Sequence, residues 1–501
     1  MDTMNEIKLT AAALLLIPSL NLKAETKNPN IIIILADDLG YGDVSAYGRK
    51  TINTPNIDLL ANGGVCFLNG YATSATSTPS RYALFTGMYP WKNPNAKILP
   101  GDAPLLIDKN QYTLPKMLKN AGYTTGAIGK WHLGMGDGDV DWNQNIYPGA
   151  KEVGFDYSCL IAATNDRVPT VYVENGRVVG LDPEDPIKVS YTQPLSGCIT
   201  ALTNPEDMKM KYSIGHNQAL INGIPRIGYM TGGKTACWKD EDMADYFVEK
   251  VSDFIHANKK SPFFLYYGLH QPHVPRVPHP RFAGSTSMGP RGDAIIEADW
   301  CVGELIECLK KNDLLENTLI IFSSDNGPVL DDGYQDEAVK KVGSHSPSDH
   351  LRGGKYSLYD AGTHVPFFVY WKDKIKPIVS ESIVCQMDLL ASIADLLHQR
   401  IPDELDSRSY LKTFLGKSKV GRKDLIIEAQ GRLALRTERY VLIPPYNGAA
   451  KNYAQIELGN LSSYGLFDLD KDREQQKNLA DKEPKILHRL SDVFKEVTKR
   501  D

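Results

Sequence analysis

The segment SATSTPSRYALFTG, residues 74–87, gathers hydroxyl side chains, a proline and an arginine at the start of a predicted helix. One interpretation is structural: Ser77 or Thr78 caps the helix, Pro79 takes its first position and Gly87 ends it. The other is chemical, with Ser77 as the reacting residue. The segment alone favours capping, so the choice depends on what else the fold brings close to Ser77.

Acidic side chains follow two predicted strands. Asp37 and Asp38 end the run IIIILADD, and Asp325 and Asn326 follow the run IIFSS. Two carboxylates about 4 Å apart repel by roughly 4 kcal/mol at an effective dielectric constant of 20, so such a pair needs a proton, a basic group or a metal. Each pair could instead begin a turn. Taken together, the four oxygen-bearing side chains suit a hard cation, Ca²⁺ or Mg²⁺, better than zinc.

Histidine, lysine and arginine side chains follow or lie between the predicted strands. Any one of them could be a solvated charge or a structural hydrogen-bond donor. Because the carboxyl ends of parallel strands meet at one edge of a sheet, we expect them to lie together. A cation and several basic groups around one hydroxyl predict an oxyanion site. The residues are Lys130 and His132 in GAIGKWHLG, His270 and His273 in LHQPHVP, and Arg352, Lys355 and His364 in LRGGKYSLYDAGTHVP.

The elements that position these residues alternate between strand and helix. The continuous β-branched run at 31–38 is typical of a strand buried on both faces, and therefore of a parallel sheet. Three further segments of the chain each contain a helical pattern followed by a short apolar strand. This alternation predicts an α/β fold with a doubly wound, mostly parallel sheet flanked by helices. These helix and strand pairs span residues 113–131, 240–270 and 295–327.

Two regions depart from this alternation. Residues 135–240 are rich in Gly, Pro and Asn and are too long for a plain connection, so we expect an insertion that shapes a substrate site. Beyond residue 420, short strands and a final amphipathic helix predict a small antiparallel sheet covered by one helix. The predicted division is a main domain over 25–420 and a C-terminal subdomain over 421–501, as expected for a chain of 501 residues.

The composition is that of a globular protein, with 42% hydrophobic residues and a formal net charge of -5, which argues against nucleic-acid binding. The apolar run from Leu9 to Leu20 is too short to span a bilayer. It predicts a signal peptide over residues 1–24, cleaved near Ala24, and export to the periplasm. A buried N-terminal helix is the alternative, and no other segment resembles a membrane span.

The seven cysteines show no CxxC spacing, which excludes zinc-ribbon and redox motifs. We expect them to be mostly buried and unpaired, with one or two disulfides as the alternative in an exported protein.

The motif from Ser77 to Arg81, continued by Leu84, Thr86 and Gly87, resembles the maturation motif of the formylglycine-dependent sulfatases. The resemblance covers nearly the whole mature chain, through LADDLGYGDVSAYG, GKWHLG, HQPHVP, DNGP, RGGK and YGLFDLDKDREQQKNLA. It implies the fold of the alkaline phosphatase superfamily. It also implies that Ser77, where cysteine is commoner, is oxidised to formylglycine by a sulfatase-maturing enzyme that accepts serine.

The same resemblance implies the chemistry. One hydroxyl of the hydrated aldehyde attacks sulfur, and the other later expels sulfate. Asp37, Asp38, Asp325 and Asn326, with residue 77, would hold one calcium ion, and Arg81 would reach back to residue 77 and the metal site. Lys130 and His132 would hold the hydrate and the sulfate. His273 and Lys355 would grip the sulfate, with His273 donating a proton to the leaving alcohol.

The substrate implied is a sulfated glycan, and we expect an exo-acting enzyme on 6-O-sulfated galactose or N-acetylgalactosamine. Asp166, Arg167, Arg226 and Trp238 in the insertion are candidate sugar ligands, although they could equally form surface contacts. His364 joins them because it stands where many relatives carry a different loop sequence.

Two other functions are compatible with parts of the pattern. A phosphatase or phosphodiesterase of the same superfamily would use unmodified Ser77, but it would normally need a histidine-rich two-zinc site. A sulfated-glycan-binding protein would never convert Ser77.

Overall fold

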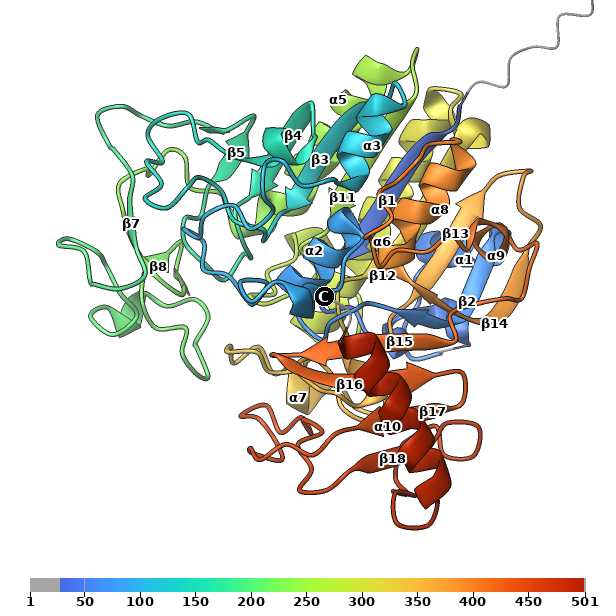
Figure 1. Ribbon diagram of the computed structural model, residues 1–501. Coiled ribbons are helices and arrows are strands. Elements are labelled where there is room, and N and C mark those ends of the chain that lie inside the picture. Colours follow the sequence, from blue (N-terminus) through green and yellow to red (C-terminus); the bar gives the residue numbers. More distant parts are fainter. Residues whose placement is uncertain (1–27, 49, 500–501) are drawn as a thin grey trace, which may run out of the picture.

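The computed structural model describes residues 28–48 and 50–499. Its centre is a ten-stranded sheet (Figure 1). From one edge to the other, the strands are β14 (Ile378–Cys385), β2 (Val65–Tyr71), β13 (Phe367–Trp371), β12 (Thr318–Ser324), β1 (Asn30–Ala36), β11 (Phe263–Gly268), β3 (Thr124–Lys130), β4 (Tyr157–Ile161), β5 (Tyr172–Glu174) and β6 (Arg177–Val178).

The five central strands, from β12 through β1, β11 and β3 to β4, are parallel, while β13, β5 and β6 join in antiparallel pairs. The predicted mostly parallel sheet is confirmed, and so are its predicted strands β1, β3, β11 and β12. The sequence pattern missed β2, which Asn69 and Gly70 interrupt, and β13 and β14, which follow one another with no helix between them.

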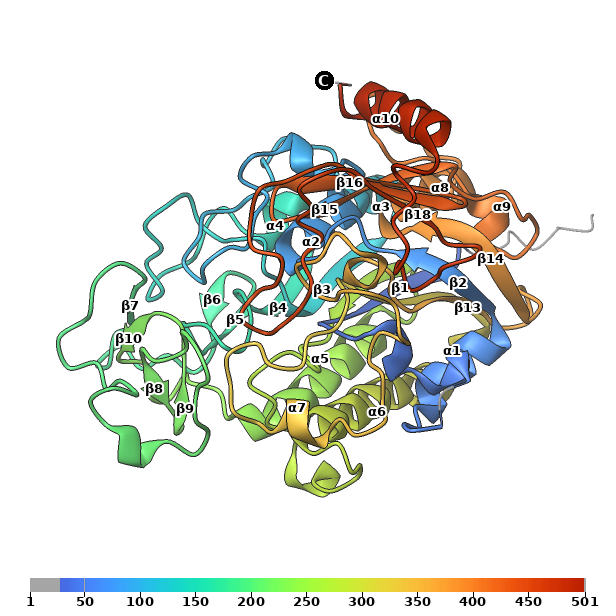
Figure 2. The same cartoon turned by 90° about the horizontal axis from the view of Figure 1, so that it is seen from below.

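Both faces of the sheet are covered by helices, as a doubly wound fold requires (Figure 2). In β1, Ile31, Ile33 and Leu35 face one core and Ile32 and Ile34 face the other. The first core includes α2 (Ser77–Thr86), α3 (Leu114–Asn120) and α8 (Leu389–Leu396), and the second includes α1 (Pro55–Gly63), α5 (Met243–Asn258) and α6 (Pro290–Lys311).

The predicted insertion over 135–240 has two parts. Its first part contains α4 (Ala150–Val153) and extends the central sheet with β4, β5 and β6. Its second part forms two small ribbons at the left of Figures 1 and 2: β7 (Lys188–Ser190) with β10 (Tyr229–Thr231), and β8 (Leu220–Ile221) with β9 (Ile224–Pro225).

The C-terminal subdomain is the predicted antiparallel sheet with one covering helix. Its strands are β15 (Asp424–Ala429), β16 (Arg432–Thr437), β17 (Tyr440–Ile443) and β18 (Gly465–Asp468), and α10 (Pro484–Thr498) packs on them. Strand β15 also pairs with the segment before α2: the amide of Ala75 donates to the carbonyl of Glu428 over 2.8 Å, and the amide of Glu428 donates to Thr73 over 2.9 Å. The two α-helices not yet mentioned are short: α7 (Ala338–Lys341) and α9 (Leu411–Phe414).

All seven cysteines lie within the described ranges, where none forms a disulfide and four are buried, which confirms that they are unpaired. None of the helices in these ranges is both long and apolar enough to cross a membrane. The predicted signal peptide and its cleavage near Ala24 lie outside the described residues.

Candidate active site

Ser77 is the first residue of helix α2 and is only 3% exposed. The N-cap is Thr76, with extended backbone and no capping side-chain bond, and Pro79 is therefore the third helical residue rather than the first. The interpretation of Ser77 as a cap is wrong, because its Oγ instead accepts a hydrogen bond from Lys130 Nζ over 2.7 Å and donates to Asn326 Oδ1 over 3.4 Å. Gly87, with a φ of 66°, ends the helix in the left-handed conformation, as the sequence predicts.

The acidic residues meet because their strands are neighbours. Ala36 of β1 pairs with Ser324 of β12, so Asp37 and Asp325 leave the sheet side by side. Asp38 adopts a left-handed backbone with a φ of 63°, which breaks the strand alternation that would send its side chain to the opposite face from Asp37. The side-chain Nδ2 of Asn326 then donates to Asp38 Oδ1 over 2.7 Å. The predicted convergence of these four side chains is what the structure shows.

Two buried cations lie among these carboxylates. Lys130 Nζ, at the end of β3, is 2.6 Å from Asp37 Oδ1 and 3.3 Å from Asp325 Oδ2. Arg81, one turn along α2, donates from Nε and Nη2 to Asp325 Oδ2 over 3.1 and 2.7 Å. Arg81 therefore reaches the metal-ligand candidate Asp325, and among the described residues it makes no hydrogen bond to Ser77.

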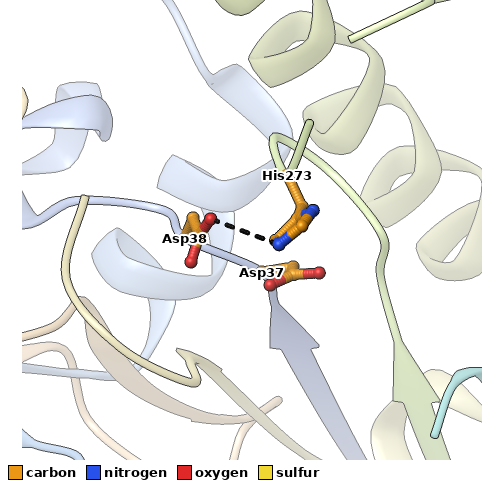
Figure 3. A group of neighbouring side chains, drawn as sticks. All are labelled: Asp37, Asp38 and His273. Atoms are coloured by element: carbon orange, nitrogen blue, oxygen red, sulfur yellow. Dashed lines mark ion pairs between the residues drawn. The ribbon is translucent and has the colours of Figure 1, made fainter. Parts of the chain in front are cut away.

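The carboxylate set fits a hard divalent cation. Both oxygens of Asp37 are buried without a hydrogen bond, although Lys130 forms an ion pair with one of them. Burial raises the pKa of Asp37 to about 6, as expected for a carboxylate with too little positive charge around it. Asp37, Asp38 and His273 also offer ligand atoms that all lie within 4.8 Å of one another (Figure 3). The oxygen-dominated donors match Ca²⁺ or Mg²⁺ rather than zinc.

Formal charge supports the same conclusion. Four carboxylates face three cations, which leaves one negative charge uncompensated. A divalent cation would turn this into one positive charge, equal and opposite to the charge of a sulfate monoester. The carboxylates are Asp37, Asp38, Asp325 and Asp332, and the cations are Arg81, Lys130 and Lys355.

In both His132 and His273 one ring nitrogen is hydrogen-bonded to a backbone carbonyl, which leaves the other nitrogen facing the site. His132 Nε2 lies 2.9 Å from the carbonyl oxygen of Leu99 and therefore carries the proton, while its buried Nδ1 has no partner. Burial, with Lys130 nearby, holds the pKa of His132 well below its usual value, so the ring is neutral and Nδ1 is a free acceptor. His273 donates from Nδ1 to the carbonyl of Val274 over 2.6 Å, which leaves Nε2 facing Asp38 at 3.8 Å (Figure 3).

Lys355 forms ion pairs with the metal-ligand candidate Asp38 and with Asp332, a residue that the sequence analysis did not single out. Its Nζ is 2.8 Å from Asp38 Oδ2 and 2.7 Å from Asp332 Oδ2, and these carboxylates hold the pKa of Lys355 well above its usual value despite burial. Asp332 also accepts hydrogen bonds from the hydroxyls of Tyr356, over 2.9 Å, and Tyr453. No motif or strand end marks Asp332 or Tyr453 in the sequence, because they lie in loops far apart along the chain.

Comparison with known proteins assigns this arrangement to a family. The sulfatase family model matches residues 29–399. The chain is 49% identical to an N-acetylgalactosamine-6-O-sulfatase of Bacteroides thetaiotaomicron, over 95% of this chain and 94% of that protein. It is 30% identical to human arylsulfatase A, over 94% of this chain and 88% of the relative.

The chain belongs to the sulfatase family. A solved structure described for the metabolism of multiple glycosaminoglycans by B. thetaiotaomicron superposes with a TM-score of 0.93 and 49% identity, covering 94% of this chain and 99% of that one. The resemblance seen in the sequence and the predicted fold are both confirmed. The enzyme is a sulfuric ester hydrolase.

The sulfatase has a pocket of about 140 Å³ directly over Ser77. Two of the predicted sugar ligands, Asp166 and Arg167, line it, and their side chains form an ion pair 2.9 Å long. His216, which sequence reasoning missed, holds the other oxygen of Asp166 at 2.9 Å from Nε2. The remaining lining residues are Ile98, His132, Ile227, His273, Asp332, Lys355, Tyr356 and Tyr453.

Three predicted sugar ligands of the sulfatase do not line this pocket. Arg226 is fully buried and pairs through Nη2 with both oxygens of Asp240, 2.8 and 2.7 Å away. Trp238 lies in the core against Tyr172. His364 is buried between Asp360, 2.7 Å from its Nδ1, and the carbonyl of Leu68. We correct these predictions: each residue finds its partner inside the fold and has a structural role.

Proposed function

We propose that this sulfatase removes 6-O-sulfate from a terminal N-acetylgalactosamine or galactose residue of a glycan. The observation that carries the proposal is the placement of buried Asp166, between Arg167 and His216, in the same pocket as Ser77. Carboxylate and guanidinium groups fixed in this way present acceptors and donors to sugar hydroxyls in set directions. The 49% identity to an N-acetylgalactosamine-6-O-sulfatase over nearly the whole chain supports the same substrate class.

The active form carries formylglycine at residue 77, produced by a sulfatase-maturing enzyme that accepts serine. The hydrated aldehyde supplies an oxygen nucleophile and a second hydroxyl that allows sulfate to depart. Asp37, Asp38, Asp325 and Asn326, together with residue 77, would hold one Ca²⁺, which supplies Lewis-acid polarisation of sulfate oxygens when bound. The support for calcium is the all-oxygen donor set and the unpartnered oxygens of Asp37.

The side chains around residue 77 stabilise charge, transfer protons and bind the sulfate. Lys130, which donates to the residue 77 oxygen, stabilises negative charge on it, and the free Nδ1 of neutral His132 accepts a hydroxyl proton there. Lys355 has two of its three N–H bonds occupied by Asp38 and Asp332, which leaves one for a sulfate oxygen. His273 Nε2, with Nδ1 already committed to Val274, gives a proton to the leaving sugar oxygen.

The proposed setting is the periplasm, reached through the signal peptide over residues 1–24. Its basis is the short apolar run that follows Lys8. Cell fractionation of the native host, with N-terminal sequencing of the mature protein, tests this: a chain that still carries Leu9–Leu20 in the cytoplasm would contradict it.

A panel of sulfated monosaccharides tests the substrate. We expect release of sulfate from N-acetylgalactosamine 6-sulfate and galactose 6-sulfate. N-acetylglucosamine 6-sulfate is the matched control, since it differs from the first only in the configuration of one ring hydroxyl. Cleavage restricted to a glucosamine or uronic acid sulfate would refute the proposal.

Mass spectrometry of the peptide containing residue 77 tests the modification. Conversion of serine to formylglycine removes two hydrogens and lowers the mass by about 2 Da. An unmodified serine peptide in fully active protein would rule out the proposed nucleophile.

A further inference from the structure

Tyr453 is the only residue that the C-terminal subdomain contributes to the lining of the pocket over Ser77, among the residues that the structure describes. It lies in the loop between β17 and β18, and 46% of its surface is exposed. Its hydroxyl donates to Asp332 Oδ1. The polar end of this side chain is therefore already occupied, and its aromatic ring is what it offers to a ligand.

The partner of that hydroxyl fixes where the ring stands. Asp332 is buried, and it also binds Lys355 Nζ at 2.7 Å, which is in turn 2.8 Å from Asp38. A second phenol, Tyr356, donates over 2.9 Å to Asp332 Oδ1, the oxygen that the hydroxyl of Tyr453 also contacts. One carboxylate thus holds both the sulfate-binding lysine and the ring of Tyr453, which sets the separation between them.

The wall of the pocket formed by the insertion contributes polar groups. Asp166, Arg167 and His216 come from the insertion, and Tyr453 and Tyr356 contribute aromatic surface. Sugars present both polar hydroxyls and apolar C–H faces, and binding sites commonly match the two with polar and aromatic side chains respectively.

We propose that Tyr453 is a specificity-determining residue, whose ring packs on the apolar face of the sulfated sugar at a distance from Lys355 fixed by Asp332. This rests on the proposed function of the pocket. A sulfate on the exocyclic C6 oxygen holds the sugar ring farther from the sulfate group than a sulfate on a ring carbon does. An aromatic ring held at one fixed distance from Lys355 therefore favours one of these sulfate positions over the other.

The test compares three substitutions of Tyr453 with one matched control. Tyr453→Ala removes the ring, Tyr453→Phe keeps it without the hydroxyl, and Tyr453→Leu keeps apolar volume without an aromatic face. Tyr446→Ala is the control, because Tyr446 belongs to the same loop and is 50% exposed but does not line the pocket. Thermal unfolding of each variant confirms that it is folded.

For the alanine variant we expect KM for the 6-O-sulfated sugar to rise about tenfold, equivalent to roughly 1.4 kcal/mol of lost binding, with a smaller change in kcat. The leucine variant should fall between alanine and wild type. The phenylalanine variant keeps the ring but loses its hydrogen bond to Asp332, so its KM should rise by less than that of the alanine variant, while its preference for the 6-O-sulfated sugar should also narrow. Tyr446→Ala should keep a KM close to that of wild type. The preference of the alanine variant for 6-O-sulfated over 4-O-sulfated sugar should narrow.

Two results would overturn the proposal. An unchanged KM in Tyr453→Ala would mean that the ring does not contact the sugar. An equal rise of KM in Tyr453→Phe and Tyr453→Ala would mean that the aromatic ring itself contributes nothing to sugar binding. The wild-type substrate panel tests the proposed function separately, and the variants are then measured on whichever sulfated sugar the wild type cleaves.

Discussion

Lys130 Nζ donates a hydrogen bond to Ser77 Oγ over 2.7 Å, across the junction between strand β3 and helix α2. The helix start and the strand end belong to different layers of the fold, so this contact exists only when the helix is packed on the sheet. The packing of α2 on the sheet therefore places Ser77, the proposed reacting residue, next to a buried positive charge.

Replacing Lys130 by methionine should lower kcat/KM by roughly 10²-fold to 10³-fold, because a preorganised donor at the reacting oxygen is lost. Steady-state kinetics with the sulfated sugar measure this. Lys92→Met is the control, since Lys92 pairs with Asp406 over 2.9 Å at a half-buried position away from the pocket. Its kcat/KM should match wild type, and a Lys130→Met enzyme that also matched wild type would contradict the assigned role.

Removal of calcium should destabilise the protein as well as inactivate it. A ligand present at a hundred times its Kd stabilises the folded state by about 2.7 kcal/mol, so treatment with EGTA should lower Tm and added Ca²⁺ should restore it. Asp37→Asn should show a smaller Tm shift on chelation, because one ligand charge is missing. A wild-type Tm that does not respond to chelators would argue against a resident cation.

Arg167 and Arg226 should give opposite phenotypes, although both belong to the insertion. Arg226→Met leaves Asp240 as an unpaired buried carboxylate and should cost about 3–5 kcal/mol of stability. Arg167→Met removes a pocket contact and should raise KM by about tenfold. Because His216 still holds Asp166 at 2.9 Å, its loss of stability should be smaller than that of Arg226→Met. Urea unfolding and steady-state kinetics on both variants measure the two effects, and the reverse pattern would refute the assignment.

Glu297 on α6 should make the stability depend on pH. Burial raises its pKa from 4.5 to about 7, although the amide of His279 and Nε2 of Gln271 donate to it over 2.8 and 3.0 Å. Because the folded pKa lies above the unfolded one, the contribution of this group to stability is fully present below pH 4.5 and is lost as the pH rises to about 7.

The variant Glu297→Gln avoids this loss. Its stability relative to wild type should therefore grow between about pH 5 and about pH 8, by at most roughly 3 kcal/mol. Urea unfolding at the two pH values gives the difference. Glu307→Gln, an exposed position on the same helix, should show no such gain, and a Glu297→Gln difference independent of pH would disprove the expectation.

The catalytic centre was predictable from sequence because strand order does most of the positioning. Asp37 and Asp325 follow apolar runs that indicate buried strands, and Lys130 ends the strand TTGAIGK. Parallel strands bring their carboxyl ends to one edge of the sheet. The sugar side was not predictable in the same way. Arg226 and Trp238 have the residue types of sugar ligands, but a loop sequence does not reveal that Arg226 meets Asp240 in the interior.

Asp332 and Tyr453 are pocket residues that the sequence did not predict. They are 121 residues apart and meet through their side chains alone. Neither lies at a strand end or in a recognisable motif, and an aspartate or tyrosine in a loop is common. Only the docking of the C-terminal sheet on the main domain gives these residues their significance.

That docking also has a consequence for the time course of synthesis. The hydroxyl of Ser74, three positions before Ser77, donates a hydrogen bond to Glu428, which lies 354 residues later. At ribosomal rates of about 5–20 residues per second, the segment waits roughly 20 to 70 seconds for this partner. During that interval the nascent chain lacks the strand that pairs with the segment just before Ser77. The finished enzyme leaves Ser77 3% exposed, so we expect the proposed conversion of Ser77 to formylglycine to take place on the unfinished polypeptide.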